Sequence, residues 1–371
     1  MPTFVRPVLT ALSVAIFVCS AASGQQLSGP PRDLSLWTLT CYCEVDHGST
    51  PHRVLKADDN GRVLYVARQG ATRKQIEAEI GHPAAASQLI ALVDWRLLKE
   101  KAGLYTTVIP ALGPDRMLPL RKALREQVDK ELPMLSPSVE RLKTVLDRQG
   151  FSGSLYTLTF SYALDGLLWN QLRESHLLPE TAPSKEHPFW NGLFWAVYPA
   201  QQSHPGTNTI TPGTQETPAL SLLWTDAVLP KINALQNAPE IEPAINKLGR
   251  GECRNLHVTD QQRHAWNFGG EDGRCLVPVV RQVAGDPVYD ASKALAVQAV
   301  AILGKADITP LTQLGISAED ARVIAAHETI WAILEELEAK HVVQPPAVLS
   351  APELSNETAP FMPLMFVTVD K

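Results

Sequence analysis

Apolar residues recur with a strand period and then with a helix period along the first third of the chain. In SLWTLTCYCEV (35–45), Trp37, Leu39 and Cys41 fall on one side of an alternating pattern, which predicts a strand. RVLYVAR (62–68) follows the turn signal DDNG and predicts a second strand. Between residues 71 and 112 the pattern predicts a short helix, a turn, a longer helix and a strand.

This second pattern is typical of a helix-turn-helix. Ile76 and Ile80 lie one helical turn apart, and Gly81 ends the first predicted helix. The predicted second helix places its apolar residues on one face and ends before Gly103; they are Leu89, Ile90, Val93, Leu97 and Leu98. With LYTTVIPAL (104–112) as a following strand, residues 64–112 resemble the winged-helix module. Residues 309–349 carry a weaker echo of the same order, with Ser317 as a helix cap.

The remaining segments mix helices and strands without a βαβ rhythm. Residues 118–132 and 136–150 predict two amphipathic helices, the second with Ser136 as its cap and Gly150 at its end. Residues 153–174 predict a strand that passes into a helix, and residues 286–303 predict a helix. PLMFVTVDK (363–371) predicts a closing strand. The sequence therefore predicts an α+β fold with a winged-helix-like N-terminal module, a mixed central region and a helical C-terminal module.

The N-terminus has the order of a secretory signal. Arg6 precedes an apolar run (8–19) and the small residues SAASG (20–24), which predicts cleavage after Gly24 and export to the periplasm or cell exterior. Retention of this segment as an anchor is the alternative. No later stretch is long and apolar enough to predict a membrane span. The predicted organisation is a signal peptide (1–24), an α+β domain (25–178), a linker or loop rich in proline and aromatics (179–218) and a mainly helical domain (219–371).

Four cysteines remain beyond the signal, and an even number in an exported chain predicts disulfides. Cys253 and Cys275 enclose a polar, glycine-rich loop that a bridge would close. Cys41 and Cys43 lie two apart on a predicted strand, where a direct bond is strained. The alternative is a zinc site that uses the four thiolates or adds His257 and His264, but the cysteine spacing is irregular for zinc. We expect no metal and no cofactor.

Aromatic residues are dense between residues 187 and 213. Their polar neighbours predict a contact surface for a protein, a glycan or a small molecule, made by Trp190, Asn191, Phe194, Trp195, Tyr198 and His204. The alternative is a loop that fills the core. His327 lies on the apolar face of a predicted helix, and we expect a hydrogen-bonded core histidine there rather than a ligand.

Charge argues against nucleic acid as the partner. The chain carries a net charge of −6. Residues 61–130 are locally basic, but the presumed recognition helix offers only His82, Ser87 and Gln88 as base-reading side chains. Because catalytic motifs are also missing, the sequence predicts an exported, non-enzymatic binding or interaction protein of the cell envelope. A metal-assisted hydrolase and a membrane-anchored winged-helix DNA-binding regulator are the alternatives.

Overall fold

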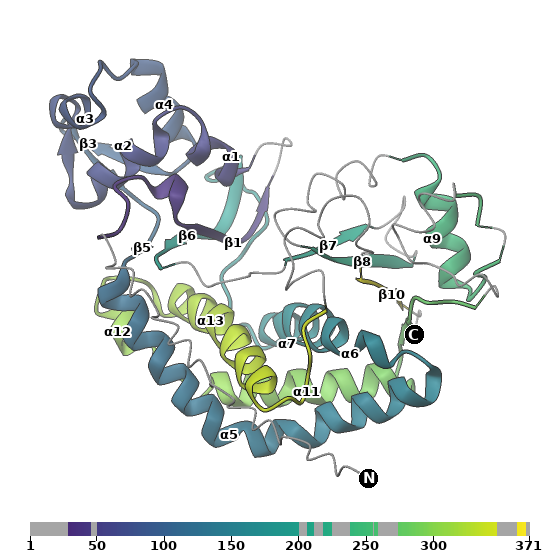
Figure 1. Ribbon diagram of the computed structural model, residues 1–371. Helices are drawn as coiled ribbons and strands as arrows, with labels where there is room; N and C mark the ends of the chain where they lie inside the picture. Colours follow the sequence, from purple (N-terminus) through teal and green to yellow (C-terminus); the bar gives the residue numbers. More distant parts are fainter. Residues whose placement is uncertain are drawn as a thin grey trace, which may run out of the picture.

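The computed structural model confirms the α+β class, with helix predominating over several small sheets (Figure 1). It describes residues 29–45, 50–199, 206–210, 218–224, 238–254, 256–258, 274–346 and 362–368. For residues 206–210, 222–224 and 362–368 only the backbone is described. The signal predicted for residues 1–24 lies outside these ranges. No helix within the described ranges is long and apolar enough to cross a membrane.

The N-terminal module is built from short helices and a small antiparallel sheet. Helix α1 (Pro51–Lys56) precedes α2 (Asn60–Val66), β2 (Ala71–Thr72), α3 (Arg73–Ile80), α4 (Ala86–Asp94), β3 (Leu98–Lys101) and β4 (Leu104–Thr107). The strands form a sheet in the order β2-β4-β3. Thr72 and Gln75 form a capping box at the start of α3, and Gly81 ends that helix in the left-handed conformation. Ala102 and Gly103, both at positive φ, make the tight turn between β3 and β4.

One predicted element type and one predicted boundary in this module are wrong. Residues 62–68, predicted as a strand, belong mostly to α2, because its buried residues Asn60, Val63 and Leu64 recur at helical spacing. The second predicted helix ends at Asp94, and Leu98 begins strand β3. Arg96, at φ +56°, turns the chain between the two elements. Ile90, which was predicted to face the core, is therefore exposed.

A three-stranded sheet separates two hydrophobic cores. Strands β1 (Thr38–Val45) and β6 (Trp190–Val197) pair antiparallel, and β5 (Ala111–Leu112) pairs with β6 in parallel. Alternate residues of β6 point to opposite faces of the sheet. Phe194 and Ala196 pack in the core of the N-terminal module, whereas Trp195 and Val197 pack in the core of the helices. Residues 190–197, which the sequence placed within a linker or loop, are thus a central strand.

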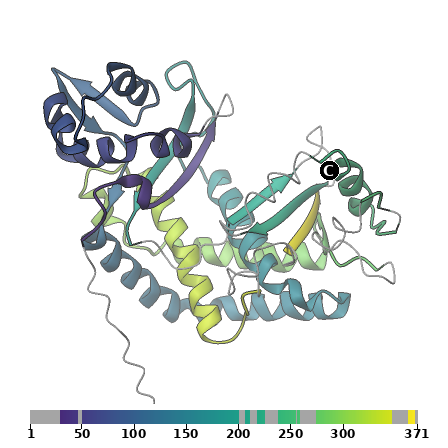
Figure 2. The ribbon, with the colours of Figure 1, turned by 45° about the horizontal axis from the view of Figure 1, so that its top comes forward.

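The helices pack in a layer beneath this sheet (Figures 1 and 2). They are α5 (Pro114–Gln149), α6 (Leu155–Thr157), the π-helical segment η4 (Leu158–Leu167), α7 (Leu168–Glu174), α11 (Pro287–Leu303), α12 (Thr309–Thr312) and α13 (Ala318–Ala339). Helix α5 packs against both α11 and α13. The predictions for α11 and for the Ser317 cap of α13 are confirmed. Because α5 precedes residues 179–218 and α11 and α13 follow them, both sides of that segment contribute to one core.

Two helical predictions are wrong in this layer. Residues 118–132 and 136–150 were predicted as separate helices, but α5 runs through Pro133 and Pro137 to Gln149. An unbroken stripe of buried leucines and valines continues across these prolines and holds the helix together. The strand predicted at the start of residues 153–174 is helical. Every residue from 154 to 164 is buried, so the alternation of large and small side chains in the sequence does not correspond to one buried and one exposed face of a strand.

A second sheet lies at the far end of the helical layer from the N-terminal module (Figure 1). Its order is β7-β8-β10-β9, made from β7 (Gly206–Ile210), β8 (Ala219–Trp224), β10 (Met362–Thr368) and β9 (Val279–Gln282). Helix α9 (Ile241–Gly249) packs against β8 and β10. The closing strand predicted near the end of the sequence is therefore confirmed as β10.

Candidate functional site

The aromatic side chains predicted to form a contact surface lie inside the protein. Trp190, Phe194 and Trp195 are at most 4% exposed. The indole N–H of Trp190 donates to the carbonyl of Trp95 at 2.6 Å. The predicted surface is therefore wrong for these three rings, because β6 is a central strand covered on both faces.

The other members of that predicted surface are not brought together as a site. Asn191 is half-buried and donates from Nδ2 to the carbonyl of Ala182 at 3.1 Å. Tyr198 is half-buried, with its ring 5.6 Å from that of Trp37. His204 lies outside the described residues. The hydrogen bond of Asn191 joins a loop to β6, and Tyr198 makes an aromatic contact with Trp37.

A polar cluster that the sequence did not predict lies between α5, α13 and the end of β6. Arg121 Nε donates to the carboxylate of Glu328 at 2.7 Å, and Arg121 Nη1 donates to the carbonyl of Pro199 at 2.6 Å. The side chain of Glu328 is fully buried and that of Arg121 nearly so. Burial by itself raises the pKa of Glu328, but its hydrogen bond to His327 and the charge and hydrogen bond of Arg121 outweigh burial and lower the pKa.

Both ring nitrogens of His327 are engaged. Nδ1 lies 3.4 Å from a carboxylate oxygen of Glu328, and Nε2 accepts from the indole N–H of Trp331 at 3.4 Å. Neutral His327 therefore carries its proton on Nδ1, since Nε2 is an acceptor. The expectation of a hydrogen-bonded core histidine is confirmed. The bonds of His327 lie within α13, whereas the Arg121–Glu328 ion pair joins that helix to α5.

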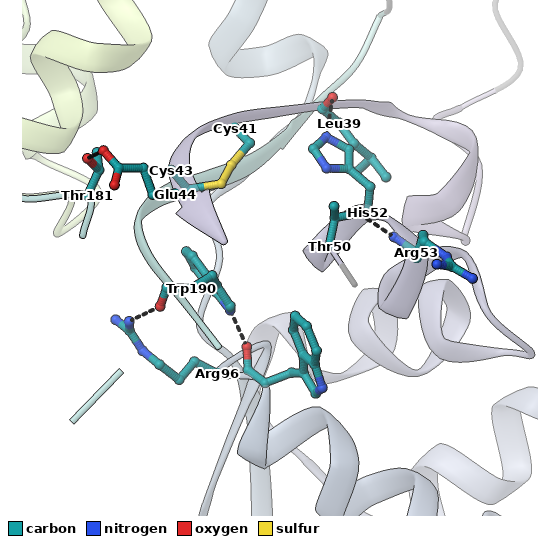
Figure 3. Close-up of a disulfide and its surroundings, with 11 residues drawn as sticks. Leu39, Cys41, Cys43, Glu44, Thr50, His52, Arg53, Arg96, Thr181 and Trp190 are labelled. Atoms are coloured by element: carbon teal, nitrogen blue, oxygen red, sulfur yellow. Dashed lines mark hydrogen bonds between the residues drawn. A yellow bond between two sulfur atoms is a disulfide. The ribbon is translucent and has the colours of Figure 1, made fainter. Parts of the chain in front are cut away.

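The cysteines form two disulfides. Cys253 and Cys275 are bridged with a Cα–Cα distance of 5.1 Å, as predicted from the loop they enclose. Cys41 and Cys43 are bridged as well, with a Cα–Cα distance of 5.4 Å (Figure 3). In the chain-entropy model the longer loop contributes about 3.4 kcal/mol to folding stability and the shorter one about 1.6 kcal/mol.

Because the thiols are paired with each other, the four-thiolate zinc alternative is wrong. His257, the described one of its two proposed histidine ligands, is exposed, and His264 lies outside the described residues. Across the described residues, no group of three or more His, Cys, Asp or Glu side chains is placed to hold a metal ion.

Helix α4, which the sequence analysis treated as the presumed recognition helix, turns an uncharged stripe and one carboxylate to solvent. Leu89 and Leu92 are buried, which fixes the opposite face outward. Ile90 is 60% exposed. The outward stripe follows helical spacing and consists of Ala86, Ser87, Ile90, Ala91 and Asp94. No lysine or arginine lies in this helix.

Two arginines of the basic region around α4 are engaged within the protein. Arg73 pairs with Glu77 at 2.7 Å and donates to the carbonyl of Ala84. Arg96 lies over the ring of Trp190, 5.0 Å from its centroid. Lys74 on α3 and Lys99 and Lys101 on β3 are exposed. These three lysines belong to α3 and β3, so α4 itself presents no positive charge.

No protein-family model matches the chain, and no curated protein or solved structure was found to match it. The winged-helix resemblance of residues 64–112 therefore stays a prediction from the sequence.

Proposed function

We propose that this chain is an exported, non-enzymatic binding protein, and that its winged-helix-like module contacts a partner protein through the outward face of α4. The observation that carries the proposal is the exposure of Ile90 on that face, between the small side chains Ala86 and Ala91. A large exposed aliphatic side chain flanked by small ones lets a partner approach closely and bury apolar area.

The same face disfavours DNA. Phosphate contacts depend on lysine and arginine, and direct base reading depends on long polar side chains. Helix α4 presents neither kind outward, and Asp94 adds a negative charge at its end. A partner with an apolar patch beside a basic residue would complement Ile90 and Asp94 together.

Export is supported by the cysteine chemistry. Both described cysteine pairs are oxidised, and disulfides persist in oxidising compartments such as the periplasm or the cell exterior. The order of charged, apolar and small residues in the first 24 residues fits the same compartment. The partner is then a protein of the cell envelope.

A photo-crosslinking residue in place of exposed Ser87 tests this function in the producing cell, with the full chain expressed. We expect a discrete adduct with one protein of the envelope fraction. Crosslinks to nucleic acid in the cytoplasmic fraction would overturn the proposal in favour of the anchored regulator. A matched probe at Val297, 47% exposed on α11, controls for non-specific capture.

A further inference from the structure

The disulfide between Cys41 and Cys43 bridges two positions on the same face of one strand. An extended strand rises about 3.3–3.4 Å per residue, so positions two apart lie roughly 6.6–6.8 Å apart. The two Cα atoms here are 5.4 Å apart. Strand β1 is therefore contracted where the bridge holds it, and ordinary strand spacing lies at the upper limit of the Cα separations that disulfides span.

Strand β6 has a glycine opposite the contracted part of β1. Cys43 pairs in register with Gly192 of β6, which adopts φ +101°. A Cβ added at Gly192 would lie 2.2 Å from the carbonyl oxygen of Tyr42 and 3.1 Å from Cα of Cys43. Only glycine fits this close approach, because any side chain would push the cysteine segment away.

The segment stays in place by contacts that do not involve sulfur. The ring of Tyr42, between the two cysteines, points to the opposite face and stacks on Trp169 at 5.2 Å. The antiparallel register with β6 continues on both sides of the bridge. Both cysteines are partly exposed, and the next residues, Glu44 and Val45, are exposed. Cys41 and Cys43 also pack against the core of the N-terminal module, so a small thiol approaches the bond from its partly exposed side while the strand remains paired.

The second disulfide provides an internal comparison. Cys253 and Cys275 are 22 positions apart, so the tertiary fold, rather than a contracted strand, sets their separation. Breaking that bond removes the constraint on a long loop, whereas breaking the Cys41–Cys43 bond removes a constraint that spans only one intervening residue. The two bonds should therefore differ in how easily they open and in what opening does to the fold.

We propose that Cys41 and Cys43 form a reversible thiol–disulfide exchange site that reacts with small-molecule thiols, while Cys253–Cys275 is a permanent structural bond. The thiolate of a small thiol attacks one sulfur, forms a mixed disulfide with it and releases the other cysteine as a thiolate, which takes up a proton. A second thiol molecule attacks the mixed disulfide. The products are the oxidised small disulfide and the reduced cysteine pair, so two electrons pass from the small thiol to the protein.

The proposal is tested on residues 25–371, the chain that remains once the predicted signal peptide is removed. The protein is equilibrated in a series of mixtures of reduced and oxidised glutathione. Free thiols are alkylated at each ratio of reduced to oxidised glutathione, and peptide mass spectrometry assigns them to a cysteine pair. We expect the Cys41–Cys43 bond to open at a ratio of reduced to oxidised glutathione at least about tenfold lower than the other bond. The far-UV circular dichroism should not change across that first step.

Opening of Cys253–Cys275 first, or opening of both bonds together with loss of structure, would overturn the proposal. The C253S/C275S variant is the matched control and should leave the first step within about twofold of its original position. The C41S variant should accumulate a mixed disulfide with glutathione on Cys43. An unreactive Cys43 in this variant, if it is folded, would also refute the exchange site.

Discussion

Arg121 Nε lies 2.7 Å from a carboxylate oxygen of Glu328, and this buried ion pair joins α5 to α13 across 207 positions of sequence. Arg121 also donates to the carbonyl of Pro199, so the pair fixes the end of β6 against the same two helices. The sheet that separates the two cores is thereby tied to the helical layer through one guanidinium.

Loss of one partner of this pair should strongly destabilise the protein. In the Arg121→Met variant the buried carboxylate of Glu328 loses its guanidinium, and we expect the free energy of unfolding to fall by about 3–5 kcal/mol. Urea unfolding followed by circular dichroism measures this. Lys340 and Asp129 join the same two helices at the surface, so Lys340→Ala is the matched control and should cost less than about 1 kcal/mol. Equal losses in the two variants would contradict the structural role of the buried pair.

A second prediction concerns pH and the contact between α2 and the turn after α3. His82 Nε2 lies 2.6 Å from a carboxylate oxygen of Asp59. The hydrogen bond with Asp59 raises the pKa of His82 above 6.5, and the bond with His82 lowers the pKa of Asp59 below 3.8. The contribution of the pair to stability is thus fully present between pH 3.8 and 6.5.

This contribution is lost as pH rises through the raised pKa of His82, and lost as pH falls through the lowered pKa of Asp59. The difference in unfolding free energy between the original protein and His82→Ala should therefore peak inside this window. Denaturant unfolding at a series of pH values tests it. In an Asp59→Asn background the peak should disappear; a peak that persists would show that another group is responsible.

The burial of the aromatic strand gives a third prediction. Phe194 is fully buried between the sheet and the N-terminal module, and Phe194→Ala should lower the free energy of unfolding by about 3–5 kcal/mol. Ile90→Ala on the outward face of α4 should change it by less than about 0.5 kcal/mol. Thermal unfolding of the two variants compares them directly. A loss of unfolding free energy at Phe194→Ala no larger than that at Ile90→Ala would contradict the burial of this strand.

Local signals in the sequence predicted the features that depend on near neighbours. Gly81 ended α3, Ser317 capped α13, and the alternation of residues 38–45 gave β1. Each depends on backbone conformation or on a hydrogen bond within a few residues. The pairing of Cys253 with Cys275 could be predicted because an exported chain favours closure of such a loop.

Long-range packing explains what the sequence could not predict. A segment dense in aromatic residues can form either a contact surface or part of a core. Here β6 pairs with β1, about 150 positions earlier in the sequence, and this pairing places the aromatic side chains in the two cores. The partners Arg121 and Glu328 have no local pattern that links them. Ile90 was predicted to face the core because the apolar residues of α4 fit two different helical faces. The buried face is the one that contains Leu89 and Leu92, which leaves Ile90 exposed.

The most direct test of the proposed function measures how Ile90→Glu changes crosslinking from position 87 of α4. The substitution replaces the exposed aliphatic centre of the outward face with a charge, and Val297→Glu on α11 does the same at a distant surface position. We predict that Ile90→Glu lowers the yield of the protein adduct at least about tenfold, because a charge would be buried at the contact. Val297→Glu should leave the yield unchanged. An adduct of equal yield in both variants would contradict binding through the outward face of α4.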